Sequence, residues 1–244
     1  MLNKINTLLA STSTTVIKEI KTTLYNPGAG TTGTTITLPA GITEGSLGLF
    51  LIGATQVGSS SIISLGVPSG FTLIIKREGV NAGTNKGGSN GLFYKYMTAA
   101  DSGTTISTIF AGNNTDQSQA VFVEVILNKM VSTKGFDSLT VVGASAAGGV
   151  ETLTDVPSVI PNNSPFFILT ISTDSDGSIS ESFSGGMELY DTSMTILNNT
   201  SRTITRLWQY NDLRIQDLPD TADFVHTSTA SAFGSQGAYA IWLK

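Results

Sequence analysis

The chain has 244 residues, of which 40% are hydrophobic and 13% charged, with a net charge of −5, 26 glycines and no cysteine. The hydrophobic content suffices for a core, whereas scattered lysines and arginines in an acidic chain exclude a nucleic-acid interface, which needs a basic stripe. No apolar run approaches the ~18 residues of a membrane span, and the lack of cysteine excludes disulfides and thiolate metal sites, so we expect no membrane insertion and no cofactor.

Residues 1–24 differ in pattern from the rest of the chain. Apolar side chains recur there at roughly helical spacing in two stripes, Leu2, Ile5, Leu8 and Leu9, then Val16, Ile17, Ile20 and Leu24. The spacing predicts one or two short amphipathic helices, with an extended leader that covers a sheet edge as the alternative. The rest of the chain offers no partner of matching length for the first stripe. We therefore expect an anchor or oligomerisation segment whose interface comprises Leu2, Ile5, Leu8, Leu9, Val16 and Ile20.

The rest of the first half alternates between strand-length apolar segments and turn signals. A Gly-rich turn or linker spans 25–34, and further turn signals stand at 67–70 and at Asn90-Gly91. Continuous apolar runs of strand length indicate buried strands. The strands expected here are 47–54, 71–76, 92–97, 106–110 and 120–127.

The second half follows a Gly/Ala/Ser-rich connection at about 130–152, which also carries a candidate strand at 138–142. The strands expected after it are 166–172, 187–190, 204–210, 224–227 and 239–243. Because the last strand ends next to Lys244, we expect no further domain downstream.

The chain carries an internal repeat of low identity. Four blocks recur in the same order at nearly constant spacing: 38–51 with 156–169, 69–73 with 185–189, 94–96 with 208–210, and 120–123 with 238–241. Such a repeat fixes architecture before individual strands are assigned. Short strands with regular turn signals and little helix predict an all-β, antiparallel, jelly-roll-like β-sandwich built from two related repeats. Two separate sandwiches and one fused sandwich are both compatible with this pattern.

The repeat also predicts equivalent positions and a core. Phe50 should superpose on Ile168, and Phe71 on Met187. The side chains expected to be buried are Leu49, Leu51, Phe71, Phe122, Phe167, Leu169 and Ile241.

Few residues could carry catalysis. His226 is the only histidine, and no Gly-x-Ser-x-Gly elbow supplies a nucleophile, so a strand-surface position is favoured over a catalytic triad. Asp212, Asp217, Asp220 and Asp223 form an acidic run, with Glu151 and Asp155 elsewhere in the same half. Paired carboxylates could cleave glycosides, but a solvated connection is the favoured interpretation of this run. The segment 174–178 lacks the full ligand set of a calcium loop, and 87–91 lacks the spacing of a phosphate-binding loop. We expect no catalytic, cofactor-binding or metal site.

Six aromatic residues on expected strands could stack on sugars: Tyr94, Tyr96, Trp208, Tyr210, Tyr239 and Trp242. Aromatic residues in alternating strands are more often core, because every second side chain points inward. A core position is therefore the favoured interpretation for each of them.

Three segments of the first half carry a family resemblance. They read Leu38-Pro39-Ala40-Gly41-Ile42-Thr43-Glu44-Gly45-Ser46-Leu47-Gly48-Leu49-Phe50, then Pro68-Ser69-Gly70-Phe71-Thr72-Leu73-Ile74, then Tyr94-Lys95-Tyr96-Met97-Thr98-Ala99-Ala100-Asp101-Ser102-Gly103-Thr104. With them, most of residues 36–244 resembles a broad group of tailed-bacteriophage and prophage virion proteins. Ser46 stands where that group typically has Asp, Phe71 where Trp is common, and Ser184-Gly185-Gly186 where the second unit has Pro-x-Gly. These departures affect turns and core. The resemblance implies a tail-fibre or capsid-surface module without enzymatic activity.

These observations lead to one main expectation. The protein should be a non-enzymatic structural protein of a bacteriophage virion, as a capsid decoration, head-fibre or tail-fibre component, with an N-terminal helical or extended anchor segment at 1–24 and repeats at 25–130 and 131–244. A host-glycan-binding receptor-recognition module is the alternative, and a glycan-cleaving enzyme is a remote one. The expected partners are other capsid or tail proteins and further copies of the chain, with a trimer as one arrangement. A host-surface glycan would be the partner under the alternative.

Overall fold

The computed structural model describes most of the first half of the chain and the strands of the second half. The described residues are 17–25, 34–57, 64–81, 86–108, 110–111, 115–127, 139–142, 150–153, 165–173, 181–183, 188–189, 203–214, 224–228 and 235–242. Five of the six predicted interface residues, Leu2, Ile5, Leu8, Leu9 and Val16, lie outside them. So do Met187 and the segment 174–178.

The first sheet has five antiparallel strands in the order β1-β9-β3-β6-β5. Their bounds are β1 (Ile17–Tyr25), β3 (Leu47–Val57), β5 (Thr72–Asn81), β6 (Lys86–Tyr96) and β9 (Thr115–Leu127). The central strand β3 places Phe50 opposite Phe93 of β6 and opposite Phe122 of β9. The two most apolar runs of the sequence therefore form neighbouring strands in the middle of the sheet, as expected of fully buried strands.

The second sheet has five strands in the order β10-β17-β12-β15-β14. Their bounds are β10 (Leu139–Val142), β12 (Pro165–Thr173), β14 (Glu188–Leu189), β15 (Thr203–Arg214) and β17 (Ser235–Trp242). Strand by strand, this order corresponds to that of the first sheet, with β12 in the place of β3, β15 in the place of β6 and β17 in the place of β9. Ile168 of β12 lies opposite Ala240 of β17, as Phe50 lies opposite Phe122. The sequence spacing is the same for both positions, since 168 − 50 and 240 − 122 are both 118.

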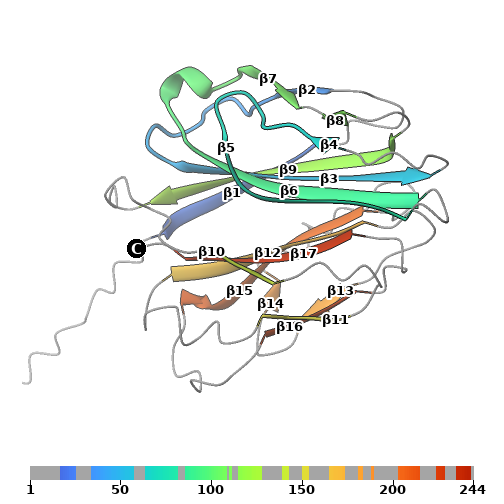
Figure 1. The fold of residues 1–244 in the computed structure, drawn as a ribbon. Coiled ribbons are helices and arrows are strands. Elements are labelled where there is room, and N and C mark those ends of the chain that lie inside the picture. The colour runs from blue at the N-terminus through green and yellow to red at the C-terminus, as the bar shows by residue number, and fades with distance from the viewer. Residues whose placement is uncertain are drawn as a thin grey trace, which may run out of the picture.

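Smaller sheets lie on the outer faces of the two large sheets (Figure 1). Over the first sheet, β2 (Thr34–Thr37) pairs with β7 (Thr105–Thr108), and β4 (Ser64–Leu65) pairs with β8 (Phe110–Ala111). Over the second sheet, β11 (Val150–Leu153), β16 (Phe224–Ser228) and β13 (Glu181–Phe183) pair in that order. All these pairings are antiparallel, and the three-residue 3-10 helix η1 (Ala99–Asp101) is the one helix within the described ranges. The predicted all-β class is confirmed.

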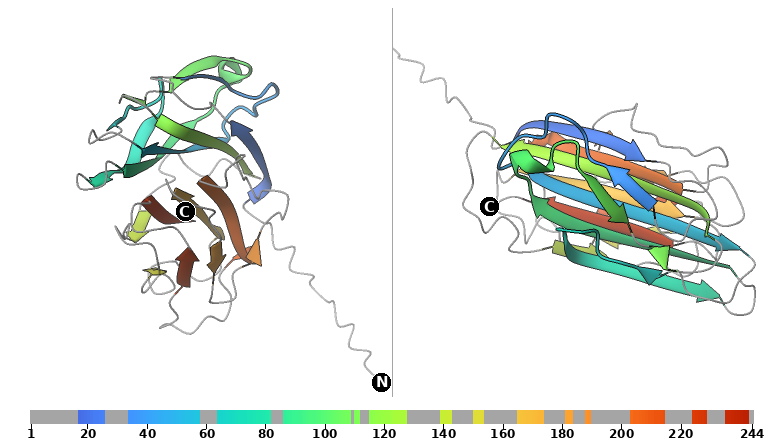
Figure 2. Two further views of the ribbon diagram at one scale, coloured as in Figure 1. Left: turned by 90° about the vertical axis from the view of Figure 1, so that its right-hand side faces the viewer. Right: turned by 90° about the horizontal axis from the view of Figure 1, so that it is seen from above.

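The two large sheets face each other. Strand β3 contacts β12 and β15, β6 contacts β12 and β17, and β9 contacts β15. Seen from above, the strands of both sheets run in nearly the same direction (Figure 2), as in aligned sheet packing. A shared apolar core fills the layer between them; its buried side chains are Ile20, Leu47, Leu49, Leu51, Leu92, Val121, Val123, Val125, Leu169 and Ile171.

A second core lies between the first sheet and its outer strands. Its buried side chains include Ile36, Leu38, Phe50, Phe71, Phe93, Met97 and Phe122. Five of the seven side chains predicted to be buried, namely Leu49, Leu51, Phe71, Phe122 and Leu169, are at most 7% exposed, which confirms those assignments. The side chains of Phe167 and Ile241 are not among those the structure describes.

The predicted helix over the second apolar stripe is wrong, and the alternative, an extended segment at a sheet edge, is what residues 17–25 form. Residues 17–25 form strand β1, which pairs with β9 at the edge of the first sheet. A register shift between Ile17 and Glu19 breaks the alternation, so the apolar residues fall at a spacing that imitates a helix. Ile20, predicted to be an interface residue, is 7% exposed and belongs to the core between the sheets, where a partner cannot reach it.

Two further local predictions also need correction. Asn90-Gly91, predicted as a turn, lies inside β6, where both residues are buried and paired with strands on each side. A Cβ on Gly91 would lie 3.0 Å from Cε2 of Phe93, so glycine here allows close packing within a strand. Asp212, assigned to a connection, lies within β15, while Asp217, Asp220 and Asp223 are outside the described residues.

Candidate functional site

Three turns meet at one end of the first sheet, and we call this region the turn end: residues 38–46, 68–71 and 97–104. Gly45 and Gly70 have φ values of +80° and close the turns at 43–46 and 68–71, in which Ser46 N–H donates to Thr43 O and Phe71 N–H to Pro68 O. Glycine at the third position of a turn is the signature of type II geometry. The turn signal predicted at 67–70 is therefore confirmed.

Backbone hydrogen bonds join two of these turns, 38–46 and 97–104, to each other. Leu38 N–H donates to Thr104 O, Gly45 N–H to Met97 O, and Met97 N–H to Ser46 O, each at 2.8 Å. The hydroxyl of Ser102 accepts a 2.7 Å hydrogen bond from Gly41 N–H. Segments about sixty residues apart in sequence are thus held in one rigid arrangement.

Asp101 organises the turn that contains η1. Its Oδ1 accepts a hydrogen bond from Lys95 Nζ at 2.5 Å, and its Oδ2 accepts hydrogen bonds from the backbone N–H and the hydroxyl of Thr98, both at 2.9 Å. Burial of Asp101 opposes ionisation, but the hydrogen bonds from Lys95 and Thr98 outweigh it and hold the pKa of this carboxyl below its usual value. The ionised carboxylate of Asp101 therefore stabilises the turn, because it accepts hydrogen bonds from Lys95 Nζ and from the backbone N–H and hydroxyl of Thr98.

Glu124 is the most deeply buried carboxylate among the described side chains, at 3% exposed. It lies on β9, and its Oε1 accepts hydrogen bonds from Thr43 N–H at 2.6 Å and from the Ser46 hydroxyl at 2.9 Å. Lys21, opposite it on β1, places Nζ 4.0 Å from Oε2. Glu124 thus ties the 43–46 turn to the sheet.

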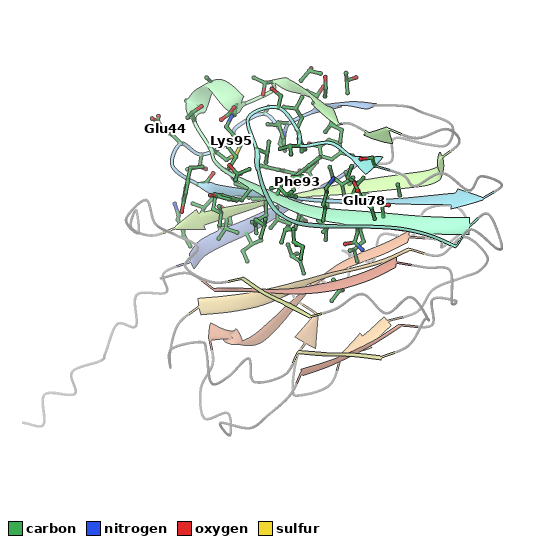
Figure 3. The ribbon with its side chains drawn as sticks, in the orientation of Figure 1. Glu44, Glu78, Phe93 and Lys95 are labelled. Atoms are coloured by element: carbon green, nitrogen blue, oxygen red, sulfur yellow. The ribbon has the colours of Figure 1, made fainter. Side chains whose placement is uncertain are left out.

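Glu78 performs a similar task between β4 and β5. Its Oε1 accepts hydrogen bonds from Leu65 N–H at 2.7 Å, Lys76 Nζ at 2.8 Å and the Ser64 hydroxyl at 3.2 Å. Partial burial raises the pKa of Glu78, but these hydrogen bonds and the charge of Lys76 leave it lowered overall. Figure 3 shows Glu44 and Lys95 near the turn end, and Glu78 farther from it along the first sheet.

These contacts decide what the carboxylates can do chemically. A general acid needs a raised pKa, and a nucleophile needs free lone pairs facing a substrate. The pKa values of Asp101 and Glu78 are lowered, and all three carboxylates, Glu124 included, accept hydrogen bonds from backbone N–H groups and neighbouring side chains. Among the described residues, no group of three or more His, Asp or Glu side chains could hold a metal ion.

Among the catalytic candidates that the structure describes, His226 and Glu151 occupy facing positions of one sheet. His226 lies on β16, the central strand of the outer sheet, opposite Glu151 of β11 and Phe183 of β13. This confirms its place on a strand. Asp212 is on β15, in the large second sheet.

The aromatic candidates divide by what the structure describes. Tyr94 and Tyr96 are half-buried, pack against the core between the sheets, and make an edge-to-face pair with ring centroids 6.3 Å apart. This confirms the core assignment for these two residues. The side chains of Trp208, Tyr210, Tyr239 and Trp242 are outside the described set.

Sequence reasoning missed the carboxylates that fasten the turns. Thr98 and Asp101 have the three-residue spacing of a capping box, which could have identified this turn. Glu124 offered no such signal, because Thr43 and Ser46 are 81 and 78 residues away. Only the fold brings those groups together.

Comparison with known proteins gives no match: no family model, no curated protein and no solved structure is significantly similar to the chain. Within the described part of the chain, no helix is both long and apolar enough to cross a membrane.

Proposed function

We propose that the chain is a non-enzymatic structural protein of a bacteriophage virion, a capsid-decoration, head-fibre or tail-fibre component, built as an antiparallel β-sandwich from two related repeats. One observation carries this proposal. The three segments that resemble phage virion proteins, 38–50, 68–74 and 94–104, meet in space at the turn end. Backbone hydrogen bonds join 38–50 to 94–104, and Thr72 of the second segment pairs with Tyr94 of the third in the sheet, which gives a physical reason for these separated motifs to occur together.

The sheet topology supports the two related repeats. The strand orders of the two large sheets correspond at all five places, and the central positions keep the same sequence spacing. Repetition of one supersecondary unit explains a sequence that recurs at low identity.

The chemistry of the first unit supports a structural role. Its buried carboxylates fasten turns to strands, and its half-buried tyrosines pack against the core. A glycan-binding platform would need such aromatic faces to be open to a sugar, so the packing of Tyr94 and Tyr96 favours the structural role over the glycan-binding alternative.

Attachment would depend on residues 1–16. Strand β1 belongs to the folded body, so a test must not remove it: deletion of 1–24 would expose β9 and mix folding with attachment. We propose instead to delete residues 1–15, with a full-length control in which Thr12, Ser13 and Thr14 are changed to Ala. The deletion variant should fold with unchanged thermal stability and be lost from purified particles, measured by quantitative mass spectrometry, whereas the control should be incorporated normally.

Two results would contradict this proposal. Absence of the wild-type protein from purified particles would refute the virion assignment. Normal incorporation of the deletion variant would place the attachment surface on the β body. A glycan array probed with the full chain tests the alternative, and release of reducing ends tests the remote enzymatic one.

A further inference from the structure

The contacts between the two large sheets occur in reciprocal pairs. Strands β3, β6 and β9 of the first sheet correspond in position to β12, β15 and β17 of the second. The contact of β6 with β12 is matched by that of β15 with β3, and the contact of β6 with β17 is matched by that of β15 with β9. The remaining central contact, β3 with β12, joins corresponding strands. Such reciprocity defines an isologous interface, in which one surface patch meets its own counterpart.

A contact between β5 and β17 extends this interface at one side. The corresponding contact would be between β14 and β9, but β14 is only two residues long. The reciprocal relation therefore holds for the central three strands of each sheet, which form the middle of the interface.

Corresponding strand positions carry hydrophobic residues in both units. Leu51 pairs with Val121, and the corresponding pair in the second sheet is Leu169 with Tyr239. Likewise, the pair formed by Leu49 and Val123 corresponds to that formed by Phe167 and Ile241. Leu49, Leu51, Val121, Val123 and Leu169 are all fully buried in the shared core.

We infer that this inter-sheet face is self-complementary, so that the first unit, residues 17–127, can bind the first unit of a second copy of the chain in place of its own second unit. The chain would then be the covalent equivalent of a homodimer. A partner for this face need only present the same apolar strands at the same angle, and a second copy does so by symmetry. Self-complementarity of this face is independent of where the protein resides.

The first experiment cleaves the full chain between the two units and measures which fragments associate on refolding. A protease site is inserted within residues 128–138 of the full chain, the folded protein is cleaved, and both fragments are separated in urea and refolded together. Native mass spectrometry then counts the pairs. We expect two N-terminal fragments, two C-terminal fragments and one of each all to occur as pairs. Exclusive formation of mixed pairs would overturn the inference.

A substitution in the face sharpens this experiment. Leu51→Glu is present twice in a pair of N-terminal fragments but once in a mixed pair. The factor by which it reduces the amount of the N-terminal pair should therefore be about the square of the factor for the mixed pair. Val67→Glu is the matched control, because Val67 is 44% exposed and lies outside the shared core, and it should change neither pair. Equal losses of both pairs with Leu51→Glu would contradict binding through this face.

A second experiment uses the uncleaved chain and does not depend on refolding of fragments. In the double variant Leu169→Glu, Ile171→Glu the second unit can no longer cover the first, because two charges would enter an apolar layer. Light scattering should show a dimer, twice the 25.5 kDa of the chain. Adding Leu51→Glu should return it to a monomer. A double variant that stays monomeric, whether folded or unfolded, would overturn the inference.

Discussion

Replacement of Glu124 should destabilise the protein by an amount that depends on which atoms replace its carboxylate. Glu124 Oε1 accepts two short hydrogen bonds, from Thr43 N–H and from the Ser46 hydroxyl. A hydrogen bond to a charged group contributes about 1.5–3 kcal/mol, and a buried donor left without its acceptor loses that contribution. Glu124→Ala removes the acceptor of both hydrogen bonds, so the free energy of unfolding should fall by roughly 3–5 kcal/mol.

Glu124→Gln separates the hydrogen bonds from the charge. The amide oxygen can still accept from Thr43 and Ser46, while the interaction with Lys21 is lost. Nζ of Lys21 is 4.0 Å from the carboxylate, and the lysine side chain is 45% exposed, so this ion pair is screened by water and contributes at most about 1 kcal/mol. Hydrogen bonds to a neutral acceptor are also weaker than those to a charged one, so the glutamine variant should lose roughly 2–3 kcal/mol, which is still less than the loss for alanine.

Urea unfolding followed by far-ultraviolet circular dichroism measures both losses, provided that the denaturant slope is unchanged. Glu19→Ala is the control, because Glu19 is a 51% exposed neighbour whose carboxylate lies 3.9 Å from the same lysine. It should change stability by less than about 0.5 kcal/mol. If the alanine and glutamine variants lose the same stability, the hydrogen bonds from Thr43 and Ser46 do not hold the turn.

Three further predictions concern the first unit. Phe122→Ala should lower the free energy of unfolding, measured with urea, by about 3–5 kcal/mol, because Phe122 is 1% exposed in the core between the first sheet and its outer strands. Leu24→Ala, at a 37% exposed position, should lower it far less. Tyr25 donates to Thr37 O at 2.8 Å, and burial raises its pKa to about 12. Since the folded state then binds the proton more tightly, stability should fall as pH rises from about 10 to 12, and Tyr25→Phe should remove this dependence in alkaline melts. The pKa of Asp101 is lowered in the folded state. The ionised carboxylate therefore stabilises the fold fully above the unfolded-state pKa of ~3.9, and this stabilisation is lost as pH falls through the folded-state pKa. Asp101→Asn should therefore flatten the acid side of the stability profile, and an unchanged profile would show that Lys95 and Thr98 do not stabilise its charge.

The buried strands could be predicted from the sequence because their signal is local. Strands β3 and β9 carry continuous apolar runs, and the buried side chains Leu49, Leu51 and Phe122 were assigned from those runs alone. The turn at 68–71 was also recognisable, because glycine with positive φ suits its third position.

Other features could not be predicted, because neighbours distant in sequence decide them. Strand β1 has helix-like spacing, and only its pairing with β9 and the register shift after Ile17 make it a strand. Asn90-Gly91 has the composition of a turn, yet strands β3 and β5 flank it on both sides, so its backbone hydrogen bonds are made in the sheet. The carboxylate of Glu124 meets donors about eighty residues away, which no local pattern encodes.

The low identity between the two halves follows from what each surface must do. The facing surfaces need apolar side chains of suitable volume, and cores tolerate exchange among such residues when the pattern is kept. Leu51 can therefore correspond to Leu169 and Val123 to Ile241 without strict conservation of type. The outer surfaces have no such common requirement: Glu124, opposite Gly48, corresponds in register to Trp242, opposite Phe166. The interface between the two sheets thus keeps hydrophobic residues at corresponding positions, while the outer faces of the two units can differ in sequence.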